Sequence, residues 1–197
     1  MIGMASILSA LERASARYVV VGGLAVILHG HLRGTADIDL VIELSPENCT
    51  KALDALAGVG LRPRLPVDMK QFADPEIRRD WVENRNMMVF QLWDPEMPGR
   101  SVDVFVREPF GFDELWSQSV LREVQGVPVH IASIPHLVAM KRTAARPRDL
   151  GVEERQEVRG VVRRALGRGL HDPPGRGDDR RVPALERHAA ALDDRER

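Results

Sequence analysis

The segment from residue 36 to residue 42 places two aspartates on one side of a short, otherwise apolar strand. Its sequence is Ala-Asp-Ile-Asp-Leu-Val-Ile, with carboxylates at Asp37 and Asp39. Successive side chains of a strand point to opposite faces, so both carboxylates project from one face while the apolar residues pack behind. Because aspartate is depleted in strands, the pair indicates a functional site rather than a merely solubilising surface.

Two carboxylates held side by side repel each other unless a cation lies between them. Magnesium takes hard oxygen ligands from one or two carboxylates and completes its octahedron with phosphate oxygens and water. Asp103, between Val102 and Val104 in a second apolar run, offers a third carboxylate. Three carboxylates on neighbouring strands suit a two-metal site that orients a triphosphate and activates an attacking hydroxyl. We therefore expect Mg²⁺ or Mn²⁺ at Asp37, Asp39 and Asp103.

A glycine pair lies upstream, where an apolar run over residues 18–21 ends and a helix predicted over 24–32 begins. Gly22 and Gly23 leave backbone N–H groups free at the positive end of that helix and let a ligand approach the backbone. A bare turn would have the same local sequence. The position of the pair ahead of the two aspartates favours a phosphate-binding turn.

Three stretches together resemble the nucleotidyltransferase superfamily related to DNA polymerase β. They are Val-Gly-Gly-Leu-Ala at 21–25, Arg-Gly-Thr-Ala-Asp-Ile-Asp-Leu at 33–40 and Val-Asp-Val-Phe at 102–105. Within the superfamily the pattern is similar to the minimal bacterial nucleotidyltransferases, especially those of abortive-infection and toxin–antitoxin systems. The resemblance extends from about residue 18 to residue 149.

The resemblance implies a reaction and a role for each matching residue. A nucleoside monophosphate would pass from a nucleoside triphosphate to an acceptor hydroxyl, with release of pyrophosphate. The metal ligands and catalytic residues would be Asp37, Asp39 and Asp103. The nucleotide would be bound by Gly22, Gly23, Arg33, Thr35, Lys141 and Asp149. The resemblance also implies tRNA or another RNA as acceptor and a cognate antitoxin protein as partner.

The order of apolar runs and turn residues predicts an α/β (α+β) fold: a short, twisted mixed sheet with helices on one face and the aspartates on the open face. A small C-terminal helical segment follows. The nucleotidyltransferase-like domain is expected over residues 1–150 and a C-terminal helix over 151–166. Residues 167–197 are rich in Gly, Pro, Arg and Asp, which predicts a flexible tail.

The individual elements follow from periodicity and capping residues. A hairpin with a long loop is expected because two apolar runs flank Asp-Pro-Glu-Met-Pro-Gly. Helices are predicted near 7–14, after Ser45-Pro46, after Asp74-Pro75, near 113–119 and from Ser133 to about 144, and further strands over 87–93, 101–106 and 127–132.

Composition sets the outer limits of function. The chain of 197 residues carries a formal net charge of -1, so any site for a polyanion must be local. Its one cysteine, Cys49, cannot form an internal disulfide, which favours a reducing compartment. The sequence lacks a leader pattern and a stretch of membrane-spanning length, so we expect a cytoplasmic protein with no membrane partner.

Other conspicuous side chains have simpler explanations. His29 and His31 lie at a predicted helix end without further metal ligands, so a metal role is not expected. The isolated tryptophans Trp81, Trp93 and Trp116 are predicted to be partly buried core residues rather than base-stacking groups.

Two other functional classes compete with the enzyme. A glycosyltransferase also uses an Asp-x-Asp metal pair, but it needs a long nucleotide-binding half before that motif, and only one strand-turn-helix unit precedes Asp37. A catalytically inactive nucleotide-binding or antitoxin-like interaction module would keep the fold without turnover. The acceptor itself stays open between an RNA end, a protein hydroxyl and an antibiotic hydroxyl.

Overall fold

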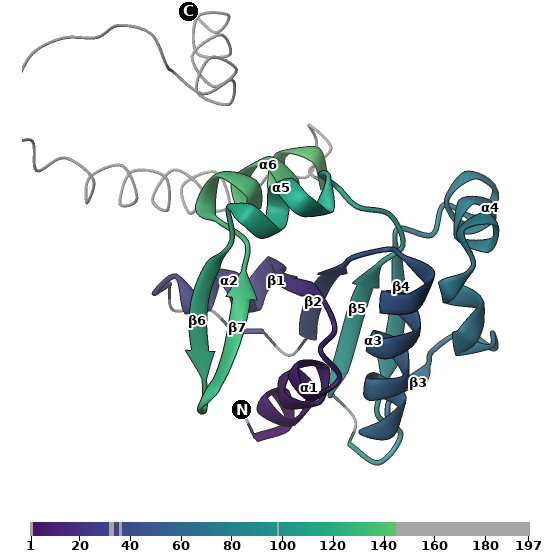
Figure 1. Ribbon diagram of the computed structural model, residues 1–197, viewed down its shortest axis with the longest axis horizontal. Helices are drawn as coiled ribbons and strands as arrows, with labels where there is room; N and C mark the ends of the chain where they lie inside the picture. The colour runs from purple at the N-terminus through teal and green to yellow at the C-terminus, as the bar shows by residue number, and fades with distance from the viewer. Residues whose placement is uncertain (1, 32–33, 36, 98, 145–197) are drawn as a thin grey trace, which may run out of the picture. The chain divides into compact units, whose positions relative to one another are not determined.

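The computed structural model describes residues 2–31, 34–35, 37–97 and 99–144. These residues form one seven-stranded mixed sheet and six α-helices (Figure 1). The strands are β1 (Tyr18–Val21), β2 (Asp37–Ile42), β3 (Arg62–Pro63), β4 (Val89–Trp93), β5 (Ser101–Phe105), β6 (Val120–Val124) and β7 (Val127–Ile131). The helices are α1 (Ile2–Arg13), α2 (Gly22–Leu28), α3 (Pro46–Gly58), the 3-10 helix η1 (Met69–Ala73), α4 (Pro75–Arg85), α5 (Phe112–Ser117) and α6 (Ile134–Ala144).

The sheet has the strand order β3-β4-β5-β2-β1-β7-β6 and mixes parallel with antiparallel pairs. β2 lies at its centre, antiparallel to β1 and parallel to β5. β4 and β5 form the predicted antiparallel hairpin. The α/β fold, the hairpin and the strand that carries the first two aspartates are therefore confirmed.

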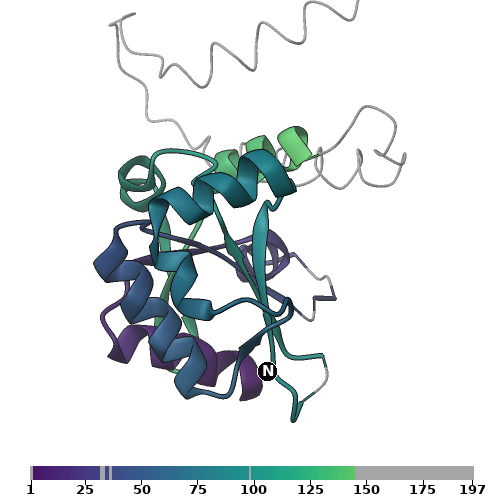
Figure 2. The same cartoon turned by 90° about the vertical axis from the view of Figure 1, so that its right-hand side faces the viewer.

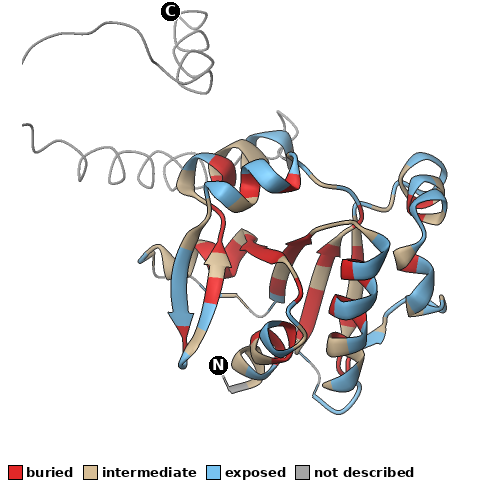
Figure 3. Ribbon diagram, in the orientation of Figure 1, coloured by how far each residue is buried: buried red, intermediate tan, exposed pale blue. Residues whose placement is uncertain are grey.

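Helices cover the two faces of the sheet unequally. Figures 1 and 2 show α1 and α3 on one face and α2 on the other. β1, β2 and β5 are largely buried between them (Figure 3). The expectation of helices on one face thus holds for α1 and α3. The aspartate face is not wholly open, because α2 begins at Gly22, directly after β1, and packs against β2.

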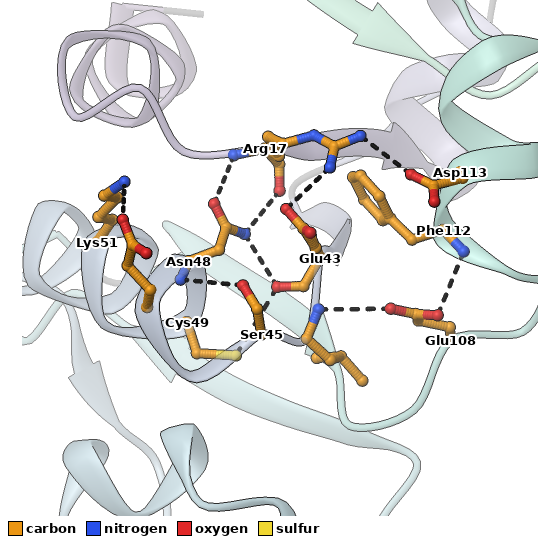
Figure 4. Close-up of polar contacts among 11 residues, drawn as sticks. Arg17, Glu43, Ser45, Asn48, Cys49, Lys51, Glu108, Phe112 and Asp113 are labelled. Atoms are coloured by element: carbon orange, nitrogen blue, oxygen red, sulfur yellow. Dashed lines mark hydrogen bonds and ion pairs between the residues drawn. The ribbon is translucent and has the colours of Figure 1, made fainter.

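The start of α3 is defined by local capping and by one buried amide. Ser45 accepts a hydrogen bond from the backbone N–H of Asn48 at 3.3 Å, and Pro46 occupies the first turn, as predicted. The Asn48 side chain accepts from the backbone N–H of Arg17 at 2.7 Å and donates to the carbonyl of Glu43 at 2.9 Å (Figure 4). This amide therefore ties α3 to the start of β1 and the end of β2.

An aromatic cluster anchors η1 and α4 to the sheet. Trp81 is 1% exposed, and its ring stacks on Phe90 of β4 with centroids 5.4 Å apart. Phe72 of η1 completes the cluster, 5.4 Å from Phe90. The expectation that Trp81 is a core residue is confirmed.

Two strands were not predicted from the sequence: the two-residue strand β3, which pairs with β4, and β6. β6 pairs antiparallel with β7 through a turn at Gln125 and Gly126, which have φ angles of 52° and 83°. Leu121, Arg122 and Glu123 of β6 are exposed, so no apolar alternation marks this edge strand. The glycine turn between two short runs was the available signal.

Among the described helices, none has the length and apolar content that would be needed to cross a bilayer. The predicted C-terminal helix over 151–166 and the predicted tail over 167–197 lie outside the described residues.

Replacing Trp81 by alanine should lower the free energy of unfolding by about 3–5 kcal/mol, because it removes the largest buried ring of the cluster. Urea unfolding followed by circular dichroism measures the change. Leu121→Ala is the control, since Leu121 is 57% exposed and its loss should cost no more than about 0.5 kcal/mol. Equal effects of the two substitutions would contradict the assignment of Trp81 to the core.

Candidate active site

The parallel register of β2 and β5 brings the predicted carboxylates onto one face. Asp39 lies directly opposite Asp103, and Asp37 lies opposite Ser101. The alternate residues Ile38 and the two valines of β5 are buried on the other face. The three aspartates therefore occupy adjacent rows of the sheet, as the alternation in the sequence predicted.

Ser101 holds the first aspartate and was not anticipated. Its hydroxyl donates a hydrogen bond to Oδ1 of Asp37, whose residue is otherwise exposed at the start of β2. Ser101 itself is only 8% exposed. The signal was present in the sequence, because Ser101 precedes Asp103 by the same two-residue step that separates Asp37 from Asp39.

The glycine pair is packed directly under two predicted site residues. Gly22 has a φ of +60°, and a Cβ added there would lie 2.6 Å from Cγ of Asp39. A Cβ on Gly23 would lie 2.8 Å from the hydroxyl oxygen of Thr35. The Thr35 hydroxyl in turn donates to the backbone carbonyl of Asp37 at 3.3 Å. Both glycines are needed because the site residues occupy the space of a side chain.

Asp103 is a partly buried carboxylate. Burial is the largest cause that raises the pKa of Asp103, and the charge of Asp37 raises it further. The Gln91 side chain and the charge of Arg64 act in the opposite direction. Oδ1 of Asp103 is buried and has no hydrogen-bond partner in the part of the chain that the structure describes. An unpartnered buried acceptor is costly in isolation and is typical of a ligand site.

A cavity of about 660 Å³ opens beside the glycine pair. Gly22, Gly23, Asp39 and Lys141 line it, so four predicted site residues meet in one place. Much of the remaining wall is apolar, with Val26, Met88, Phe105, Phe110, Ile134, Leu137, Val138 and Met140. Arg107 and Glu108 add charges that the sequence analysis did not single out.

The carboxylates differ in how readily they could bind a divalent cation. Among the described residues, no group of three or more His, Cys, Asp or Glu side chains is arranged to hold a metal ion. The carboxylate of Asp37 is held by Ser101, and that of Asp39 lies against Gly22. The donor chemistry nevertheless suits Mg²⁺, because the oxygens are hard and the buried Oδ1 of Asp103 is available.

Two predicted nucleotide-binding residues, Arg33 and Asp149, lie outside the described residues. His29 makes a structural contact, since its Nε2 lies 2.8 Å from the carbonyl oxygen of Ala132. Burial lowers the pKa of His29, which favours the neutral ring as a hydrogen-bond donor.

A family profile described as "Nucleotidyltransferase of unknown function (DUF6036)" matches residues 3–163. The chain therefore belongs to this nucleotidyltransferase family, and the resemblance seen in its motifs is confirmed at that level. Among curated proteins, none matches the sequence.

Solved structures share the fold at low sequence identity. The antibiotic-resistance factor ANT(2″)-Ia aligns over 98% of this chain and 91% of its own, with 17% identity and a TM-score of 0.55. The lincosamide antibiotic adenylyltransferase LnuA, in its lincomycin-bound form, aligns over 81% and 94%, with 14% identity and a TM-score of 0.52. A nucleotidyltransferase-like protein from Paracoccidioides brasiliensis aligns over 98% and 88%, with 17% identity and a TM-score of 0.51.

Gly22→Ala should destabilise the protein by about 1–2 kcal/mol through its positive φ, and by more through the clash with Asp39. It should also weaken nucleoside triphosphate binding because Asp39 must move. Thermal unfolding and calorimetric titration measure the two effects. Gly58→Ala is the matched control, since an added Cβ at this helical position meets open space. If Gly22→Ala had the same melting temperature and the same triphosphate affinity as Gly58→Ala, the close packing of Gly22 against Asp39 would have no effect on stability or binding.

Proposed function

We propose that the protein is a metal-dependent nucleotidyltransferase that moves a nucleoside monophosphate from a nucleoside triphosphate to an acceptor hydroxyl. One observation carries the proposal: Asp39 lies opposite Asp103 and against Gly22, with Asp37 in the next row of the same face. Membership of a nucleotidyltransferase family supports it.

The triphosphate would enter the cavity beside the glycine pair. Gly22 and Gly23 carry no side chain of their own, which would let phosphate oxygens approach their backbone. Lys141 is a cation that lines the same cavity. The apolar wall would accommodate the base and sugar and exclude water from the reacting phosphate.

Asp37, Asp39 and Asp103 would hold Mg²⁺ or Mn²⁺. When bound, the cation neutralises charge on the triphosphate and on the attacking oxygen. To bind the cation, Asp37 would give up the hydrogen bond that it accepts from Ser101. Ser101 would then act as a positioning residue that keeps Asp37 in place before substrate arrives.

The reaction replaces a phosphoanhydride bond by a phosphate ester bond. The acceptor oxygen forms a bond to the α-phosphorus, and the bond from that phosphorus to pyrophosphate breaks. Asp103, the half-buried carboxylate of β5, would take up the hydroxyl proton directly or through water. Positioning and charge neutralisation supply the catalysis, since phosphoryl-type transfer leaves little covalent chemistry to side chains.

We also propose an acceptor and a partner for this enzyme. The motifs resemble cytoplasmic toxin–antitoxin and abortive-infection enzymes related to DNA polymerase β, which favours tRNA or another RNA as acceptor and a cognate antitoxin as partner. ANT(2″)-Ia, solved with adenylyl-2″-tobramycin, keeps an antibiotic hydroxyl open as the alternative.

A second candidate function is a nucleotide-binding module without turnover. It is favoured by the absence, among the described residues, of a ready group of three metal-ligating side chains. Such a module would bind a triphosphate and transfer nothing.

Mg²⁺ with a nucleoside triphosphate should raise the melting temperature by several degrees. A ligand that binds only the folded state adds about 2.7 kcal/mol to the free energy of unfolding when its concentration is 100 times Kd. Asp37→Asn combined with Asp39→Asn should abolish the gain, and EDTA should do the same for the parent protein. Differential scanning fluorimetry measures each case. An undiminished gain in the double variant would place the metal site elsewhere.

Asp103→Asn should retain triphosphate binding but reduce label transfer to total cell RNA by about 100-fold or more, because an amide cannot accept the proton. Calorimetry and a labelled-nucleotide assay on one preparation separate the two effects. Asp54→Asn, at an exposed position of α3, is the control and should transfer normally. If Asp103→Asn transferred label at the rate of the parent, Asp103 would not be a catalytic residue. If the parent bound the triphosphate but transferred no label, the protein would be the inactive nucleotide-binding module.

A further inference from the structure

The aspartate face continues across β5 onto β4 as a partly exposed strip that has no role in the reaction described above. Gln91 lies opposite Asp103, and Trp93 lies opposite Ser101. Both β4 side chains are partly exposed, whereas the residues that alternate with them are buried on the other face. The strip therefore begins beside Asp103 and extends toward the start of β5.

Arg64 reaches this strip from the end of β3. Its backbone N–H donates to the carbonyl oxygen of Gln91 at 2.9 Å, which places it beside β4. The guanidinium carbon lies 5.9 Å from the centre of the Trp93 ring, within cation–π distance. The charge of Arg64 also lowers the pKa of Asp103, so the two side chains are within electrostatic reach. Arg64 forms no ion pair with any carboxylate in the described ranges.

The strip and the cavity lie on different sides of the row formed by Asp39 and Asp103. Phe105, at the end of β5, lines the cavity, whereas Trp93 pairs with the first residue of β5 and does not line it. A triphosphate in the cavity therefore leaves the side of Asp103 that faces Ser101 and Trp93 for the second substrate. In-line transfer needs the acceptor and the pyrophosphate on opposite sides of the reacting phosphorus.

The chemistry of the strip selects among acceptors. Trp93 offers an aromatic surface, and the planar guanidinium of Arg64 lies within cation–π distance of it. Both groups are typical platforms for an unpaired base. Arg64 also complements a phosphate, and the amide of Gln91 can both donate and accept beside Asp103. A polycationic acceptor would instead be repelled by the like charge of Arg64.

We propose that Arg64, Gln91 and Trp93 form the acceptor subsite and that the acceptor is the 3′ end of a single-stranded nucleic acid. The terminal base stacks on Trp93 and Arg64, the adjacent phosphate pairs with Arg64, and the terminal hydroxyl reaches Asp103. That hydroxyl oxygen bonds to the α-phosphorus, its proton passes to Asp103, and pyrophosphate leaves. The subsite rests on the nucleotidyl transfer proposed above. It also gives Trp93 a role beyond the core position expected from the sequence.

A binding experiment that needs no turnover tests the subsite. A fluorescently labelled single-stranded RNA is titrated into the full chain in Mg²⁺ without nucleoside triphosphate, with Trp93→Leu, Trp93→Phe, Arg64→Gln and, as control, Arg13→Gln on the exposed surface of α1. Trp93→Leu should weaken binding about fivefold or more, and Trp93→Phe should restore most of it. Arg64→Gln should reduce the slope of log K against log salt by about 0.7, the value for one lost phosphate contact. Arg13→Gln should bind like the parent.

A transfer assay with the same RNA separates this proposal from the enzyme assignment. Trp93→Leu and Arg64→Gln should raise the KM for RNA while triphosphate binding and melting temperature stay unchanged, and an RNA with a 3′-phosphate should receive no label. If the parent bound RNA through Trp93 and Arg64 but transferred no label, this result would support the RNA-binding subsite and overturn the proposed reaction. No RNA binding, binding unaffected by both variants, or transfer only to protein or small-molecule hydroxyls would overturn the subsite.

Discussion

The parallel register between β2 and β5 is the constraint on which the site depends. It sets Asp39 opposite Asp103 and leaves Ser101 opposite Asp37, so each carboxylate has a neighbour on its own face. A slip of one residue would turn Asp103 toward the buried face, where an unpaired carboxylate costs several kcal/mol. The apolar residues of β5 would be exposed by the same slip. Core packing and site geometry are therefore specified by a single pairing.

The elements of the site could be predicted from the sequence because they are local. Alternation around Asp37 and Asp39, and the glycine pair after an apolar run, each need only a few neighbouring residues. The pairing of Ser101 with Asp37 joins residues far apart in the chain, so the two-residue spacing of Ser101 and Asp103 becomes informative only when β2 and β5 are known to pair. The same applies to α2, whose position on the aspartate face follows from tertiary packing rather than from its own periodicity.

Close packing at Gly22 explains why the glycine pair and the aspartates belong together. The left-handed φ of Gly22 turns the chain from β1 into α2, and the missing side chain leaves room for the carboxylate of Asp39. The glycine turn and the carboxylate row are thereby joined through one contact. The sequence analysis ascribed the glycines to phosphate alone, but the structure gives them this second role. The seven-residue length of α2 makes backbone access more important than any helix dipole.

Charge is distributed around the aspartates in a way that the net charge of -1 conceals. Lys141 lines the cavity, and Arg64 lies beside β4. In the proposed reaction each of two anionic substrates would be drawn by a local cation, while the central carboxylates repel both. A divalent cation at those carboxylates would convert the repulsive centre into an attractive one. Substrate binding would then be coupled to the metal, since each anion meets a favourable potential at the reacting position only after the aspartates are neutralised.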